Sequence, residues 1–291
     1  MFKALGFHTI SKVFVIFAAY ILHFCLGKVL SREEYGIVGT VIAFTNFYYM
    51  FLTNGVRQGI SKLLSAGTHD HKAVVKKGMT VQVIFSLILA TANFTLAPIL
   101  AKGFGDPNFE TYIRLISFLI PLTAIYFAFT GGLNGSKLFF AEALIVSIYP
   151  LLRLSAVPLS FFGEGNEVVM VIIGFTLASF LSAIIAGGLL LTNKKFKQNA
   201  VGKEAVTNKQ LLSVSFGFII FFAAITLVLN MDTFFLQYVC KDAGLTGYYT
   251  GVHTFSLVPY YLISAFYLVI FTVAMQLIPN KSYKNYIQFF A

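Results

Sequence analysis

The sequence is short of charged residues. Only 11% of its 291 residues are charged, whereas 58% are hydrophobic and the mean hydropathy is +0.82. A soluble domain carries about 25% charged residues, so this chain lacks the polar side chains needed to cover a water-facing surface. Soluble enzymes, nucleic-acid-binding modules and disordered chains are thereby excluded. The composition predicts a membrane protein that crosses the bilayer several times.

Several chemical signatures are also missing. The two cysteines, Cys25 and Cys240, lie in or at the end of apolar runs and lack the spacing of metal ligands. The sequence has no glycine-rich phosphate loop ending in Lys-Ser/Thr, no His-Glu-x-x-His and no nucleophile beside a base. The longest polar stretch, residues 193–210, is too short for the domain on which membrane glycosyltransferases and polymerases build their sites. We therefore expect no enzyme activity, no cofactor and no metal site.

Long apolar runs, separated by charged or glycine-containing breaks, indicate eight helical spans. In hydrocarbon a backbone must satisfy its own hydrogen bonds, and runs of about 20 apolar residues do so as helices. We therefore predict an all-α, polytopic transmembrane bundle. The expected spans are residues 12–30, 36–60, 79–101, 113–132, 138–162, 168–192, 213–239 and 248–278.

The placement of lysine and arginine predicts the orientation of these spans. With the N-terminus inside, fifteen of the 21 basic residues fall on the inner side, five on the outer side and Arg153 within a span. Both termini are therefore predicted to be cytoplasmic. Residues 1–192 would form a six-helix bundle and residues 193–212 a basic cytoplasmic linker. Residues 213–291 would hold the first two spans of a second bundle and a cytoplasmic tail.

Four ionisable residues are predicted to lie inside the spans at a similar depth. A charge near the bilayer centre costs at least about 2.5–3.5 kcal/mol on insertion scales, so such a residue is a functional candidate by default. At a rise of 1.5 Å per residue, Arg153 and Asp232 lie about 12–13 Å from the outer ends of their spans. His23 and His253 lie about 10 Å from theirs.

Two interpretations of this layer stay open. In the first, Arg153 and Asp232 pair and hold helices together, and each histidine is hydrogen-bonded inside the bundle. In the second, these residues line a hydrated cavity for an anionic headgroup, together with Asn46 and Asn230 at a similar depth. Arginine suits phosphate because its planar guanidinium donates two hydrogen bonds and stays charged. Arg57 is a weaker candidate, since it lies near the cytoplasmic end of its span and can extend toward water.

Small residues predict close helix packing at Gly55-x-x-x-Gly59, Gly131-x-x-x-Gly135 and Gly247-x-x-x-Gly251. We interpret residues 131–135 as a tight inner turn between the fourth and fifth spans. An offset of 211 positions also relates the starts of the second and eighth spans, which indicates a parallel repeat of six helices. The matched positions are Gly36, Val41 and Phe44 in the first copy and Gly247, Val252 and Phe255 in the second.

Residues 30–36, Leu-Ser-Arg-Glu-Glu-Tyr-Gly, resemble a Leu-x-x-x-Glu-Tyr-Gly pattern that opens the second span of the polysaccharide flippases. These Wzx-type O-antigen transporters belong to the MATE-like multidrug/oligosaccharidyl-lipid/polysaccharide exporter superfamily. Residues 54–60, 131–135 and 246–251, and the Asp of Asn230-Met231-Asp232, are similar to the corresponding places. The resemblance covers essentially the whole chain, as the first two-thirds of a protein with twelve to fourteen spans. We therefore expect a fragment, a truncated reading frame or one half that needs a partner.

The resemblance implies that a lipid-linked oligosaccharide crosses the bacterial inner membrane by alternating access between two six-helix bundles. Its undecaprenyl pyrophosphate linker would meet Arg57 and Arg153, while Asp232 would couple an ion or proton or restrain Arg153. The expected partners are this lipid-linked glycan, membrane lipids and glycan polymerase or ligase machinery, and no nucleic acid.

Two alternatives remain. One is a cation-coupled drug exporter of the same superfamily. Such exporters usually carry a carboxylate in the membrane core of the first bundle, where the sequence offers only Glu142, at the inner edge. The other is a non-transporting membrane scaffold or remnant.

Overall fold

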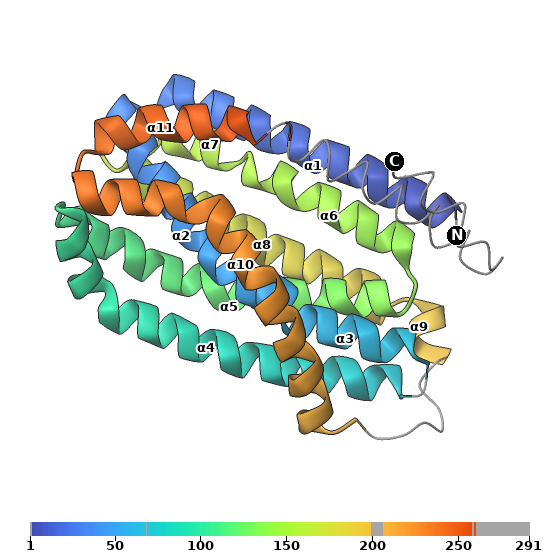
Figure 1. The fold of residues 1–291 in the computed structure, drawn as a ribbon. Coiled ribbons are helices and arrows are strands. Elements are labelled where there is room, and N and C mark those ends of the chain that lie inside the picture. Colours follow the sequence, from blue (N-terminus) through green and yellow to red (C-terminus); the bar gives the residue numbers. More distant parts are fainter. Residues whose placement is uncertain (1, 68, 199–205, 258, 260–291) are drawn as a thin grey trace, which may run out of the picture.

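The computed structural model describes residues 2–67, 69–198, 206–257 and 259. Every regular element in these ranges is an α-helix, which confirms the predicted all-α class (Figure 1). In chain order the helices are α1 (Phe2–Val29), α2 (Arg32–Asn54), α3 (Val56–Ser65), α4 (His71–Phe104), α5 (Asn108–Gly135), α6 (Phe139–Arg153), α7 (Ala156–Ser160), α8 (Glu167–Leu191), α9 (Lys194–Gln198), α10 (Asn208–Cys240) and α11 (Ala243–Ser256).

Six segments of the described chain are long and apolar enough to cross a membrane. They are Ile10–Val29, Arg32–Ser65, His71–Phe104, Asn108–Gly135, Phe139–Ser160 and Glu167–Leu191, and they correspond in order to the first six predicted spans. The predicted seventh span, 213–239, lies within α10. The predicted eighth span, 248–278, begins in α11, and most of it lies outside the described residues.

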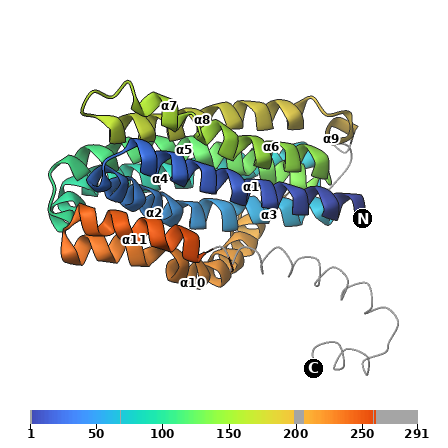
Figure 2. The same ribbon diagram turned by 90° about the horizontal axis from the view of Figure 1, so that it is seen from above.

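The helices form layers. In Figure 2, α7 and α8 lie along one edge of the molecule and α10 and α11 lie along the opposite edge. Helix α10 crosses α2 and α3 obliquely in Figure 1, whereas α11 packs along α2. The layer formed by α1 to α6 therefore separates the last two helices of the described chain from α8.

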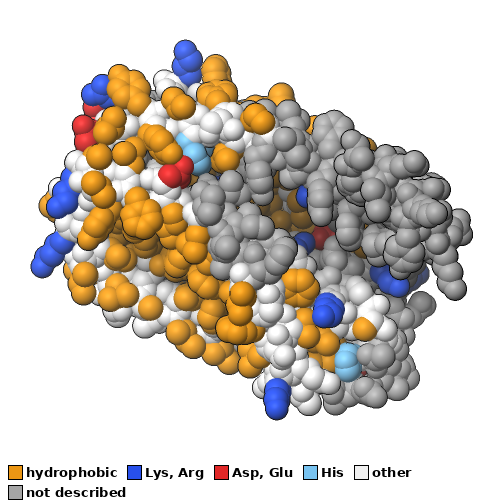
Figure 3. All heavy atoms as spheres, in the orientation of Figure 1, with side chains coloured by type: hydrophobic (Ala, Val, Ile, Leu, Met, Phe, Trp, Pro, Cys, Tyr) orange, Lys and Arg blue, Asp and Glu red, His pale blue; other side chains and the backbone are white. Residues whose placement is uncertain are grey.

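Burial separates the inner helices from the outer ones. Within its most apolar window, α5 is 56% buried inside the molecule, whereas α1 and α4 are each 22% buried. Helix α5 packs against α3, α4 and α8, so it is one of the inner helices of the described chain. Helices α1 and α4 present large apolar side chains outward, such as Phe17 and Ile99. In Figure 3, hydrophobic side chains cover much of the described part of this face, as a surface in contact with lipid requires.

The glycines of residues 131–135 are helical, so the predicted turn at this place was wrong. Helix α5 continues to Gly135, and the chain turns afterwards, at Lys137, whose φ is 58°. A Cβ added at Gly131 would lie 2.6 Å from the carbonyl oxygen of Arg57, and one at Gly135 would lie 2.8 Å from that of Ser61. These glycines therefore let α3 approach the backbone of α5, as small residues do between helices in membranes.

The starts of α2 and α11 are fixed by similar caps. Ser31 accepts a hydrogen bond from the Glu34 amide, and the Glu34 carboxylate accepts one from the Ser31 amide at 2.7 Å. Asp242 accepts a hydrogen bond from the Leu245 amide at 2.9 Å. Both caps satisfy amides that have no partner inside the helix. We call the end of the molecule that carries Ser31 and Asp242 the capped end.

The helix boundaries support the predicted repeat. Helix α1 ends at Val29 and α10 at Cys240, while α2 begins at Arg32 and α11 at Ala243. In each pair, the second boundary follows the first by 211 positions, which is the offset that relates the matched residues in the sequence. The hairpin of α1 and α2 and the hairpin of α10 and α11 are therefore equivalent in their local design.

Candidate functional site

A cavity of about 470 Å³ lies between the two equivalent hairpins. Residues of α1, α2, α10 and α11 line it, and most of them are apolar or small. Its volume is in the range of sites that enclose a drug-sized molecule. Among the described lining residues, the polar side chains with nitrogen atoms are Lys12, His23, Asn46 and His253.

Among the predicted site residues whose side chains the structure describes, three line the cavity. His23 comes from α1, Asn46 from α2 and His253 from α11, so residues more than 200 positions apart share one wall. The fourth polar residue, Lys12, is not one of the predicted site residues. It lies about three turns from His23 on the same helix. This spacing places both side chains on one face of α1, and it could have indicated from the sequence that Lys12 shares a site with His23.

His253 is held by a carboxylate outside the cavity lining. Its Nε2 lies 3.2 Å from Oδ2 of Asp232 on α10, and the same oxygen accepts a hydrogen bond from the Tyr249 hydroxyl at 2.6 Å. The rings of Tyr249 and His253 stack with centroids 5.8 Å apart. Asp232 therefore orients the imidazole of His253, as a carboxylate does for many functional histidines.

His23 and Tyr20 join α1 to its neighbours. Nδ1 of His23 lies 3.0 Å from the hydroxyl of Tyr35 on α2, and the two rings meet edge to face. Tyr20 donates a hydrogen bond of 2.7 Å to the carbonyl oxygen of Thr254 on α11. These hydrogen bonds thus join α1 to α2 and α11 on the side of the cavity that is nearer the capped end.

Arg153 and Asp232 take different partners in the described part of the chain. The guanidinium of Arg153 lies over the ring of Phe175 on α8, 4.0 Å from its centroid, as in a cation–π contact. Its Nε is buried without a hydrogen-bond partner among the described residues. Arg153 is not one of the residues that line the cavity. The predicted Asn230 lies in α10, and its side chain is outside the described residues.

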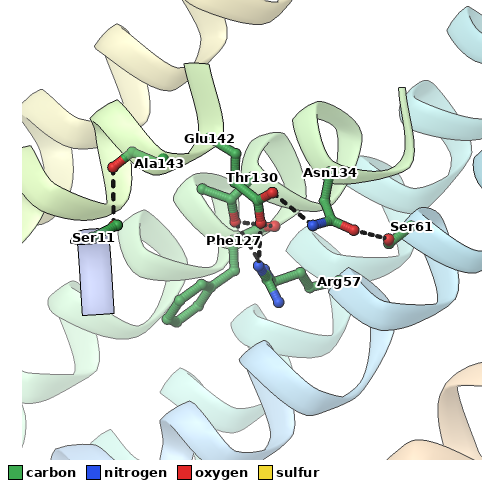
Figure 4. A network of polar contacts seen from close by, with 8 residues as sticks. All are labelled: Ser11, Arg57, Ser61, Phe127, Thr130, Asn134, Glu142 and Ala143. Atoms are coloured by element: carbon green, nitrogen blue, oxygen red, sulfur yellow. Dashed lines mark hydrogen bonds and ion pairs between the residues drawn. The ribbon is translucent and has the colours of Figure 1, made fainter. Parts of the chain in front are cut away.

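Arg57 belongs to a separate polar network, shown in Figure 4. Its Nη2 donates to Glu142 at 2.8 Å and its Nε donates to Thr130 at 3.1 Å. Asn134 donates to the second oxygen of Glu142 at 2.6 Å and accepts a hydrogen bond from Ser61. The network ties α3, α5 and α6 together, and its ion pair neutralises the charge of Arg57.

Glu142 is a buried charged residue that is not among the predicted site residues. The sequence places it at the inner edge of a span, but the structure buries it, with a side chain that is 3% exposed. Its partner Arg57 is 85 positions away. Two features of the sequence could have indicated this pair. Glu142 is an acidic residue close to the membrane-buried run of the fifth span, and it lies at a depth similar to that of Arg57.

In the described part of the chain, six candidate spans, an apolar outer face and a cavity with a few polar side chains in a largely apolar wall define a multi-pass membrane protein with the architecture of a transporter. The family model described as "Polysaccharide biosynthesis protein" matches residues 2–277, and the chain belongs to this family. This is a family of transporters and not of enzymes. The predicted resemblance to the polysaccharide flippases is thereby confirmed.

One curated relative is also a transport protein. The chain is 26% identical over 120 residues to the "Succinoglycan biosynthesis transport protein ExoT" of Rhizobium meliloti (strain 1021). The match covers 41% of this chain and 24% of that protein, so it spans about a quarter of the relative's length. No solved structure matches the chain significantly.

Proposed function

We propose that this protein carries a lipid-linked oligosaccharide across the bacterial inner membrane, with its N- and C-termini in the cytoplasm. The observation that carries this proposal is the cavity between the two hairpins, where Lys12, His23 and His253 are set in a largely apolar wall. The substrate would be an undecaprenyl pyrophosphate that bears a glycan repeat unit. Such a molecule joins an apolar tail to an anionic linker, so its site needs nitrogen donors beside apolar surface.

The charges around the cavity favour an anion. Lys12 carries a positive charge, and none of the described lining residues is an aspartate or a glutamate. Asp232 is not one of the lining residues, and its Oδ2 contacts the Tyr249 hydroxyl and the His253 imidazole. The lysine ammonium offers three donors, and the amide of Asn46 and the imidazoles add further hydrogen-bonding groups. In a site of low dielectric constant, such groups bind phosphate more strongly than they would in water.

The two arginines contribute indirectly in this proposal. Arg57 is engaged by Glu142, and Arg153 lies over Phe175, so neither guanidinium belongs to the cavity lining. They hold the helices that shape the first bundle. A cation-coupled drug exporter is less well supported, because a cationic drug would meet Lys12 in the cavity and the buried Glu142 is already paired.

A lipid-flipping assay tests this proposal. The purified chain is reconstituted into liposomes with undecaprenyl pyrophosphate oligosaccharide that carries a fluorescent nitrobenzoxadiazole group. Added dithionite bleaches only the label in the outer leaflet. We expect the chain to bring the inner-leaflet label to the outer leaflet, so that its fluorescence is also lost, whereas protein-free liposomes keep it. Equal protection in both kinds of liposome would reject the proposed function.

A further inference from the structure

We propose that the end of the molecule opposite the capped end binds an anionic phospholipid, which lies across α9 and the start of α4. We call this end the lysine end, because it carries many exposed lysines. They include Lys62, Lys72, Lys76, Lys194, Lys197 and Lys209. The inference goes beyond the proposed function, because binding of a membrane phospholipid needs no glycan substrate. The proposed orientation of the chain would place this lipid in the cytoplasmic leaflet.

The two ends of the molecule differ in charge. At the capped end, acidic residues occupy the first turns of several helices, as Glu110 does in α5 and Glu167 in α8. Among the described residues of the lysine end, the acidic ones are Asp70 and Glu142. Asp70 is half-buried at the cap of α4, and Glu142 is buried in its ion pair. The described surface of the lysine end is therefore positively charged, as a binding site for an anionic headgroup requires.

Helix α9 is fixed to the rest of the molecule by one aromatic side chain. Phe196 is 1% exposed and belongs to the same apolar cluster as Val75 of α4 and Leu190 of α8. Its ring centroid lies 6.2 Å from that of His71, the first residue of α4. Figure 2 shows α9 at the end of α8, and it packs against both α8 and α4. Burial of this large side chain therefore holds α9 in place although the helix has only five residues.

The chain that follows α9 returns to the same helix. Lys77 of α4 donates a hydrogen bond to the carbonyl oxygen of Val206, whose side chain is buried. Both described ends of the predicted linker, residues 193–212, are thus attached beside the first two turns of α4. The position of α9 over the start of α4 is therefore fixed from both sides.

Two pairs of exposed lysines meet at this place. Lys72 and Lys76 are four positions apart on α4, and Lys194 and Lys197 are three positions apart on α9, so each pair shares one side of its helix. Because α9 packs on α4, both pairs contribute to one surface. Leu191, at the end of α8, is 52% exposed and offers apolar surface to an acyl chain. Each ammonium group has three donors for a phosphate, and basic surfaces at the ends of spans bind lipid headgroups.

Lysines beside a span also set its orientation during insertion, and this role would explain their number by itself. It needs no fixed structure after insertion, whereas Phe196 holds α9 in one place in the finished protein. Lysines that only set orientation would leave the affinity for phospholipid unchanged when they are neutralised. The two explanations therefore predict different results in the same experiment.

Native mass spectrometry of the purified chain in a neutral detergent measures bound lipid during a titration with palmitoyl-oleoyl phosphatidylglycerol. We expect Lys194→Gln/Lys197→Gln to weaken binding by about 25-fold, since each lysine beside an anionic lipid contributes about fivefold. The matched control is Lys28→Gln/Lys102→Gln, which removes the same charge from exposed lysines of the capped end. This control should bind phosphatidylglycerol as the unaltered protein does. Phosphatidylcholine, which has no net charge, should bind about tenfold more weakly than phosphatidylglycerol.

A second variant tests the placement of α9 and leaves the charge unchanged. Phe196→Ala removes the side chain that holds α9, so its lysines lose their fixed position, and the affinity should fall by about tenfold. Phe161→Ala, at a side chain that is 67% exposed, is the matched control and should leave the affinity unchanged.

Unchanged affinity in the α9 lysine variant, or an equal fall in the lysine control of the capped end, would overturn the proposal. A folded Phe196→Ala protein that binds phosphatidylglycerol as tightly as the unaltered protein would overturn it as well. If Phe196→Ala does not fold, the lysine variants decide, because they change only exposed side chains. The titration contains no glycan lipid, so its failure and the failure of the flipping assay are separate results.

Discussion

Replacing Glu142 with alanine is expected to lower the free energy of unfolding by about 3–5 kcal/mol, because Arg57 would keep a buried charge without its counter-ion. The side chains of the pair are 3% and 16% exposed, so water cannot replace the lost carboxylate fully. Asn134 would lose an acceptor at the same time. Denaturant unfolding of the purified protein in detergent measures the change.

The matched control is Glu110→Ala. Glu110 pairs with Arg114 at 2.7 Å, but its side chain is 37% exposed and that of Arg114 is 44% exposed. Such a surface pair is worth less than about 1 kcal/mol. The double variant Arg57→Leu/Glu142→Leu should recover most of the lost stability, since it removes both buried charges. If Glu142→Ala costs no more than Glu110→Ala, the pair does not hold the bundle together.

Reversing the charge of Lys12 is expected to weaken binding of undecaprenyl pyrophosphate by about 100-fold. A hydrogen bond to a charged group contributes about 1.5–3 kcal/mol, and each 1.4 kcal/mol changes affinity tenfold. Lys12→Glu loses this contact and adds a repulsion from the phosphate. Lys12→Gln, which loses only the charge, should weaken binding by about tenfold. Titration of a fluorescent undecaprenyl pyrophosphate into nanodiscs that contain the protein measures the affinity.

Lys28→Glu is the control for this prediction. Lys28 lies on α1 with Lys12 but does not line the cavity, and its ammonium lies 5.9 Å from the ring centroid of Phe24. The net charge of the protein changes by the same amount in both variants, so a general electrostatic effect would weaken both. Equal losses of affinity in Lys12→Glu and Lys28→Glu would show that the phosphate does not bind in the cavity.

Most of the helical framework is predictable from the sequence, because each span satisfies its own hydrogen bonds in lipid and so shows itself as a local apolar run. The first six predicted spans all match candidate spans of the structure. The offset of 211 positions, inferred from a few matched residues such as Gly36 and Gly247, reappears in the helix boundaries and in the contacts of these two glycines.

The side-chain partners could not be predicted in the same way. Counting residues along a helix gives the depth of a side chain but not the neighbour it faces, since successive residues rotate around the helix axis. Arg153 and Asp232 were placed at one depth, yet Arg153 lies over Phe175 and Asp232 meets His253. The ion pair of Arg57 with Glu142 depends on how α3 and α6 pack on α5, and no local pattern encodes that packing.

We propose above all that the cavity between the two hairpins binds the phosphate of a lipid-linked glycan. Solid-state NMR tests it most directly, by measuring dipolar coupling between ³¹P of bound undecaprenyl pyrophosphate and ¹⁵N in the lysine side chains. We predict a lysine signal dephased by phosphorus that Lys12→Gln abolishes and Lys28→Gln preserves. Dephasing that survives in Lys12→Gln, or none in the unaltered protein with the lipid bound, would contradict this account.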